Sequence, residues 1–147
     1  MERSPLLVID ASVAVKWFVV EPHREKALRI REGYARGVIE LLAPSLIQYE
    51  VGNAIRFHPG STPEHVAEAV QSILGMQMGG GEVSAGSAEA ASRIAFEEEI
   101  TMYDAFYLAL AERSRARLVT DDRRLYRKVR KRRSMMQLLE DYQTPGL

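Results

Sequence analysis

Short apolar runs alternate with longer amphipathic stretches along the chain. Leu6-Leu7-Val8-Ile9 is a continuous apolar run, suited to a strand buried on both faces. Leu41-Leu42-Ala43 and Arg117-Leu118-Val119-Thr120 predict two more strands, and a short strand is expected over 82–86. Strands that alternate with helices through short connections indicate a parallel sheet covered on both faces. The pattern therefore predicts an α/β fold, and 147 residues predict a single domain over 1–147.

The expected helices are marked by capping residues at their starts. Ser45 begins a capping-box pattern, and Thr62-Pro63 combines a cap with proline at the first helical position. The predicted helices run from Ser12 to about Val19, Pro22 to about Tyr34, Ser45 to about Phe57, Thr62 to about Met78, Ser87 to Glu98, Thr101 to near Ser114, and from about Arg123 onwards. Gly79-Gly80-Gly81 is a candidate hinge that lacks the spacing of a phosphate-binding loop, and the tail 140–147 is expected to be loose.

Charge is segregated along the chain. Lys and Arg together number 20, as do Asp and Glu, but residues 123–133 hold eight of the basic residues and no acid. The remainder has 12 basic and 20 acidic residues, a net charge of −8. A basic helix and tail over about 123–147 thus follow an acidic body, and the helix could contact RNA phosphates. The candidate contacts are Arg123, Arg124, Arg127 and Lys128.

Cysteine and membrane signals narrow the class of protein. There is no cysteine, which excludes a disulfide scaffold and a thiolate metal site. The apolar run between Met1 and Asp10 is too short for a signal peptide, and no stretch approaches the roughly 18 apolar residues of a membrane span. We therefore expect a soluble, cytoplasmic protein without a membrane partner.

Four acidic positions are expected to converge at one end of the sheet. Asp10 and the pair Asp121-Asp122 each follow a strand directly, Asp104 heads a helix, and Glu50 lies early in another. Taken singly, the aspartates are ordinary helix caps. Together they lie where an open parallel sheet has its functional cleft, outside the carboxyl ends of the strands. Crowded carboxylates repel unless a cation intervenes, and oxygen-only ligands favour Mg²⁺ or Mn²⁺.

Glu50 is predicted to face the interior. Its helix carries apolar residues at Ile47, Val51, Ala54 and Phe57, and Glu50 falls within that stripe. A carboxylate turned inward is costly unless it is paired or bound to a metal. The position of Glu50 therefore favours a functional role over a purely structural one.

Four segments resemble motifs of the PIN-domain nucleases, particularly the VapC-type toxins of toxin–antitoxin pairs. Asp10 ends a segment similar to the family's first-strand motif, and Glu50 and Asn53 match its E-x-x-N helix motif. Asp104 lies in a segment similar to its third-acid helix. Asp122 stands two after a threonine, as in its final motif. The segments are Val8-Ile9-Asp10-Ala11-Ser12, Glu50-Val-Gly-Asn53, Thr101-Met-Tyr-Asp104-Ala-Phe-Tyr-Leu-Ala-Leu-Ala111 and Leu118-Val-Thr120-Asp121-Asp122-Arg-Arg-Leu125.

The resemblance implies a three-layer α/β/α fold and a nuclease that cleaves RNA with a divalent metal. Its catalytic and metal-binding residues would be Asp10, Glu50, Asp104 and Asp122. Asp121 stands where the family usually has a small uncharged residue, so either Asp121 or Asp122 could contact metal. The resemblance also implies a homodimer and inhibition by a cognate antitoxin protein.

Three neighbours of the acids are supporting candidates. Ser12 and Thr120 could orient the carboxylates or the scissile phosphate, although Ser12 is equally suited to helix capping. Asn53 could hold Glu50 or its water.

Other functions fit the pattern less well or remain open. An aspartyl-phosphate phosphatase would need a second Asp two residues after Asp10, where Ser12 stands. A receiver domain would need an acidic pair near the first strand. Two alternatives remain open. One is a catalytically silent PIN fold that binds RNA or protein, although the presence of all four acids argues for activity. The other is a DNA nuclease of the related flap type, although such proteins are usually longer.

Overall fold

A four-stranded parallel sheet forms the centre of the computed structural model, which describes residues 3–146. The strands are β1 (Leu6–Ile9), β2 (Glu40–Leu42), β3 (Arg117–Thr120) and β4 (Met136–Leu138). The helices are α1 (Ala11–Ala14), α2 (Arg24–Ala35), α3 (Ile47–Arg56), α4 (Pro63–Met76), α5 (Ala85–Glu98), α6 (Met102–Ser114) and α7 (Arg123–Val129), with 3-10 turns η1 (Val15–Trp17) and η2 (Leu139–Asp141). The strand order is β2-β1-β3-β4, and every neighbouring pair is parallel.

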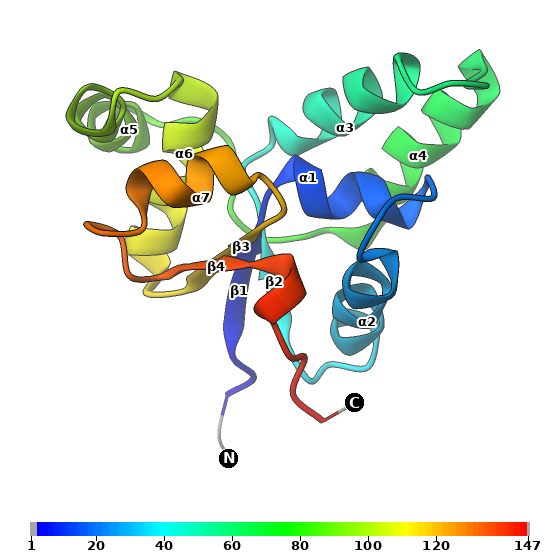
Figure 1. The fold of residues 1–147 in the computed structure, drawn as a ribbon, viewed down its shortest axis with the longest axis horizontal. Helices are drawn as coiled ribbons and strands as arrows, with labels where there is room; N and C mark the ends of the chain where they lie inside the picture. Colours follow the sequence, from blue (N-terminus) through cyan, green and yellow to red (C-terminus); the bar gives the residue numbers. More distant parts are fainter. Residues whose placement is uncertain (1–2, 147) are drawn as a thin grey trace.

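Helices cover both faces of this sheet. Figure 1 shows α1–α4 on one side and α5–α7 on the other, so the predicted three-layer α/β/α fold is confirmed. Within residues 3–146, none of these helices has the length and apolar character needed to cross a membrane.

The apolar run of β1 is the middle of the core. Val8 pairs with Leu42 of β2 on one side and with Leu118 of β3 on the other. Val8, Ile9, Leu118 and Val119 are fully buried, as expected for strands covered on both faces.

A side-chain cap begins at least one helix on each side of the sheet. Thr62 Oγ1 accepts the backbone N–H of His65 at 3.1 Å, with Pro63 at the first position of α4. Thr101 Oγ1 accepts the N–H of Asp104 at 3.1 Å and starts α6. Caps of this kind satisfy donors that a helix leaves unpaired.

Three sequence predictions about this fold are wrong. The capping box expected from Ser45 is absent, since α3 begins after Leu46 without a side-chain cap hydrogen bond. Residues 82–86 form no strand, because Ser84 caps α5 and Val83 is exposed. The tail is not loose over its first part, since Leu139 and Tyr142 are buried and Lys26 Nζ donates to the Tyr142 carbonyl at 2.8 Å. The strand β4, which leads into this tail, was not predicted.

The triple glycine lies along the edge of the sheet. Ala43 N–H donates to Gly79 O at 2.9 Å, and Ser45 N–H donates to Gly81 O at 3.2 Å. Gly80 has φ +116°, and a Cβ there would come within 2.4 Å of the Ala43 carbonyl oxygen. The segment is therefore a glycine-dependent edge contact with the end of β2.

Arg133 joins the end of the basic segment to α5 and α6. Its side chain lies 2.7 Å from Glu97 Oε2 and 3.5 Å from Glu98 Oε1, and it also pairs with Glu112. Glu98 is buried, although it has charges on both sides of it in sequence. Burial alone would lower the pKa of Arg133, but its carboxylate partners raise it.

Candidate active site

The carboxyl ends of β1 and β3 lie next to each other in the middle of the sheet. The chain moves from β1 to β2 on one side and returns to β3 on the other, which makes this pair the switch point of the sheet. Asp10 follows β1 directly, and Thr120 is the last residue of β3. The residues that follow these strands therefore meet at the position where parallel α/β sheets commonly bind ligands.

The carboxylate of Asp10 is buried and accepts hydrogen bonds from two hydroxyl groups. Ser12 Oγ donates to Asp10 Oδ1 at 2.5 Å, and the Ser12 N–H donates to the same oxygen at 3.1 Å. Thr120 Oγ1 donates to Asp10 Oδ2 at 2.5 Å. Burial raises the pKa of Asp10 from 3.8 to about 6; the two hydroxyls oppose that rise, and the charges of Asp104 and Asp122 add to it.

Asp104 and Asp122 stand at helix starts, close enough for their charges to interact. Asp104 is in the first turn of α6, and Asp122 caps α7 by accepting the Leu125 N–H on Oδ1 at 3.0 Å. Burial raises the pKa of Asp104, and the charge of Asp122 raises it further. Asp122 thus combines the capping role with membership of the acidic group.

Glu50 is half-buried and bound to α6. The Tyr107 hydroxyl donates to Glu50 Oε1 at 2.8 Å, and burial together with the charge of Asp104 raises the Glu50 pKa. The stripe predicted for this helix is confirmed at Ile47 and Val51, which are buried, and is wrong at Ala54 and Phe57, which are exposed. Glu50 therefore lies at the border of the core, beside the buried part of its helix, and is bonded there to Tyr107.

Tyr107 was not found by sequence reasoning. It is buried, and burial and the charges of Glu50, Asp10 and Asp104 raise its pKa. These charges place its hydroxyl among the acids. Its position three residues after Asp104, nearly one helical turn, was the only signal in the sequence.

Among residues 3–146, Asn53 and Asp121 have no side-chain hydrogen bond to the four predicted acids. Asn53 is exposed, and among residues 3–146 no hydrogen bond links it to Glu50. Asp121 Oδ2 lies 2.9 Å from Nζ of the buried Lys16. The charge of Asp122 raises the pKa of Asp10, whereas Asp121 is not among the charges that act on Asp10. Of the two adjacent aspartates, Asp122 is the one that lines a cavity together with Asp104.

The basic residues differ in how far they are free to bind an anion. Arg123 pairs with Glu140 at 2.7 Å, and Lys128 Nζ donates to the Glu99 carbonyl at 2.5 Å. Arg124 and Lys128 line a cavity of about 270 Å³ together with Asp104 and Asp122. Arg127 is exposed. Cationic side chains therefore border the acids directly.

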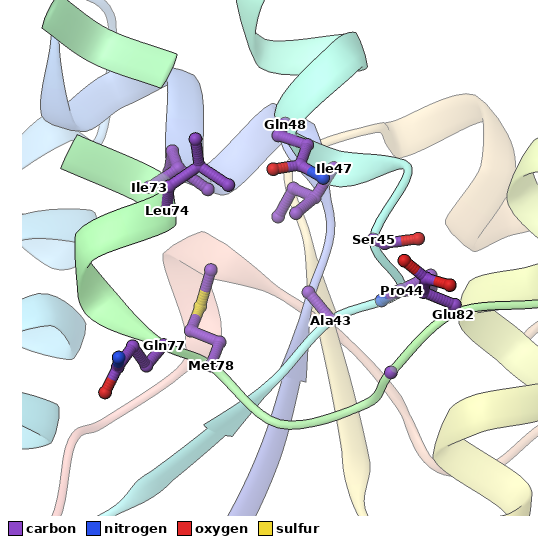
Figure 2. Close-up of a pocket in the computed structure, with 11 residues that line it drawn as sticks. Ala43, Pro44, Ser45, Ile47, Gln48, Ile73, Leu74, Gln77, Met78 and Glu82 are labelled. Atoms are coloured by element: carbon purple, nitrogen blue, oxygen red, sulfur yellow. The ribbon is translucent and has the colours of Figure 1, made fainter. Parts of the chain in front are cut away.

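A second cavity lies apart from the acids, between α3, the end of α4 and the segment that follows it. Figure 2 shows Ile47 on one wall and Ile73, Leu74 and Met78 on the other. Its volume is about 200 Å³, and its lining contains none of the four predicted acids. Its character is mainly apolar.

No metal site is preassembled in the part of the chain that the structure describes. Among residues 3–146, no three Asp, Glu or His side chains lie close enough to hold one ion. The acids are near enough to raise one another's pKa but remain apart, as like charges do.

The fold and the site define the class: an α/β/α protein in which a buried aspartate at the switch point of the sheet interacts with further carboxylates nearby. The family model of the PIN domain matches residues 7–131, and the chain belongs to this family. PIN nucleases are generally dependent on divalent metals.

Several solved structures share the fold. PAE2754 from Pyrobaculum aerophilum is 25% identical, with a TM-score of 0.65 over 92% of this chain and 85% of its own. A toxin–antitoxin complex from Klebsiella pneumoniae contains a chain that is 15% identical, with a TM-score of 0.66 over 90% and 97%. VapC20 of Mycobacterium tuberculosis, a toxin that cleaves the sarcin–ricin loop, is 15% identical, with a TM-score of 0.60 over 78% and 87%. A comparison with curated proteins gave no match.

Proposed function

We propose that this chain is a Mg²⁺- or Mn²⁺-dependent endoribonuclease and the toxin of a toxin–antitoxin pair. The observation that carries the proposal is the buried Asp10 at the switch point, whose pKa is raised to about 6 by burial and by the charges of Asp104 and Asp122. Membership of the PIN family supports nuclease chemistry at this position.

The donor set fits a hard divalent cation. Only carboxylate oxygens are supplied by the four acids, Asp10, Glu50, Asp104 and Asp122. The pKa values of Asp10, Glu50 and Asp104 are raised, and a bound cation would lower them again. These residues would hold the ion after small side-chain movements bring them closer. When bound, such an ion activates water and stabilises the negative charge that develops on a phosphodiester.

Residues around the acids keep them oriented for this chemistry. The Ser12 and Thr120 hydroxyls fix both oxygens of Asp10, and Tyr107 fixes Glu50. The hydroxyl donors hold Asp10 in its charged form at neutral pH by opposing the effect of burial. Asn53, one turn along from Glu50, is proposed to act on the substrate side through the water around Glu50.

The RNA backbone is proposed to approach over α7. Arg124 and Lys128 share a cavity with Asp104 and Asp122, so phosphates that flank the scissile bond can pair with cations there. Arg127 and, after release from Glu140, Arg123 would extend the contact.

The biological assembly is proposed from the similar structures. They include chains from toxin–antitoxin complexes, one of them from Klebsiella pneumoniae. We propose that this chain pairs with an antitoxin protein, forms a homodimer and acts on RNA in the cytoplasm.

Cleavage of a mixed pool of structured and single-stranded RNAs, in Mg²⁺, Mn²⁺ or EDTA, tests the catalytic proposal. Asp104→Asn is the informative variant, because the cap to Thr101 uses the backbone N–H of residue 104 and survives the change. Glu64→Gln, an exposed acid on α4, is the matched control.

Cleavage that requires metal, persists in Glu64→Gln and is lost in Asp104→Asn supports the ribonuclease proposal. A folded wild-type protein that neither binds Mn²⁺ by calorimetry nor cleaves any RNA in the pool contradicts it. That second outcome favours the alternative, a silent PIN fold that binds RNA or protein.

A further inference from the structure

Lys16 is a buried cation beside the candidate active site. Its side chain is 3% exposed, and its Nζ lies 2.9 Å from Asp121 Oδ2 and 3.8 Å from Glu21 Oε1. Lysine is almost never fully buried unless it is paired. Replacing a buried ion pair with apolar residues is often neutral or stabilising, so stability alone does not account for this pair.

Asp121, the partner of Lys16, belongs to the turn after β3, which is hydrogen-bonded to the two hydroxyl groups that bind Asp10. The Asp121 N–H donates to Ser12 Oγ at 2.8 Å, and Ser12 Oγ in turn donates to Asp10. The next N–H, of Asp122, donates to Thr120 Oγ1 at 3.0 Å, and that hydroxyl also donates to Asp10. The turn after β3 is therefore connected to the segment after β1 by two relays of hydrogen bonds.

The ion pair is a third connection between these two segments. Lys16 is in η1, six residues after Asp10, and η1 is itself fixed because Arg24 Nε donates to the Lys16 carbonyl at 2.8 Å. The pair engages Asp121 Oδ2 with Lys16. Asp122, for which no ion pair is found among residues 3–146, instead lines a cavity together with Asp104.

We propose that Lys16 is a positioning residue for the acidic site. Its ammonium group holds Asp121 outside the site and keeps the Thr120–Asp122 turn in the register that presents Asp122. The expected effect of Lys16 on metal affinity rests on the proposed metal-dependent function. Its expected effect on the Thr120–Asp122 turn does not.

Lys16→Met tests the effect on the turn, because methionine keeps the packing of the aliphatic chain and removes the charge. We expect amide hydrogen exchange at Asp121 and Asp122, measured by NMR in EDTA, to become at least about 10-fold faster. The amides of Leu118 and Val119 inside β3 should be unchanged. Lys26→Met, which removes a lysine bonded to the Tyr142 carbonyl, is the matched control. Unchanged exchange at Asp121 and Asp122 would overturn the proposal.

Mn²⁺ affinity, measured by calorimetry well below the unfolding temperature, tests the effect on the site. Loss of a positive charge near the acids should by itself tighten cation binding. Loss of a positioning contact should instead weaken it, by about 10-fold. Weaker binding in Lys16→Met, with no change in Lys26→Met, supports the proposal, whereas equal or tighter binding contradicts it.

Asp121→Asn guards against misfolding of the buried variant. It removes the same ion pair from the more exposed partner, whose side chain is 23% exposed. The buried Lys16 ammonium keeps Glu21 Oε1 at 3.8 Å and can still donate to the asparagine oxygen, which limits the cost to the fold. We expect the same faster exchange at Asp122, and we expect the Lys16→Met and Asp121→Asn double variant to be no worse than the worse single variant. Additive effects would show that the two residues act separately and would refute the pairing.

A wild-type protein that binds no Mn²⁺ would overturn the proposed function, while the exchange data would still decide the role of Lys16 in the turn.

Discussion

Asp10→Asn should stabilise the metal-free protein at neutral pH while removing its proposed activity. In the wild type, burial and the neighbouring acids raise the Asp10 pKa from 3.8 to about 6, so ionisation of Asp10 opposes folding. At about 1.36 kcal/mol for each pKa unit, the cost above pH 6 reaches about 3 kcal/mol. Asparagine has the shape of the protonated acid, and its amide can still bond to Ser12 and Thr120.

The pH dependence of this gain follows from the direction of the shift. A raised pKa means that the folded protein binds more protons than the unfolded chain between about pH 4 and 6, so the contribution of Asp10 to stability is present below pH 4 and is lost as pH rises. The Asn variant lacks this loss. Its advantage should therefore be near zero at pH 4 and up to about 3 kcal/mol at pH 7.5, or roughly 6–12 °C in Tm.

Urea and thermal unfolding in EDTA, at pH 4.0 and 7.5, measure both proteins. Added Mn²⁺ should stabilise the wild type through binding to the folded state but leave Asp10→Asn unchanged. A variant that is no more stable than the wild type at pH 7.5, or that gains equally at both pH values, would refute the reasoning. The first result would mean that the hydroxyl groups compensate fully for the burial of Asp10.

Three further predictions concern other parts of the molecule. Arg124→Ala should weaken RNA binding, measured by fluorescence anisotropy, and reduce the slope of log affinity against log salt by about 1, with an unchanged slope as the contrary result. Gly80→Ala should lower the urea unfolding free energy by about 2 kcal/mol, because the backbone is left-handed and the new methyl group meets the Ala43 carbonyl; a neutral effect would contradict the glycine requirement. Arg133→Met should lower Tm in a pH-dependent way, with a cost of about 3 kcal/mol at pH 7, because Glu98 is left buried and charged; recovery in the Arg133→Met and Glu98→Gln double variant checks this cause.

The sequence predicted those parts of the fold whose signals are local. The apolar runs before Asp10 and Asp121 identified β1 and β3, since strands buried on both faces need uninterrupted apolar residues. The strand Met136–Leu138 was missed because three residues that follow a basic run have no periodicity to detect. A strand was wrongly predicted over 82–86, where the β-branched residue Val83 lies in an exposed connection.

The candidate site shows the same division. Asp10, Asp104 and Asp122 could be named from their places after strands and at helix starts. The residues that bond to the acids come from segments that are distant in sequence. Tyr107 of α6 donates to Glu50 of α3, and Lys16, near the start of the chain, pairs with Asp121 after β3. Contacts between residues more than fifty positions apart leave no mark on periodicity or capping patterns, so only the structure reveals them.

The glycine segment has a consequence for how copies of this chain can assemble. Backbone donors at the end of β2 are already occupied by Gly79 and Gly81, and the opposite border of the sheet is the three-residue β4. An open border with free N–H and C=O groups is a template for a foreign strand and a route to fibrous aggregates. Protection at β2, with so short a strand at β4, leaves little template for growth by strand addition. The glycine segment, which is required at Gly80 for the close approach to Ala43, thus also shields the β2 border of the sheet from a foreign strand.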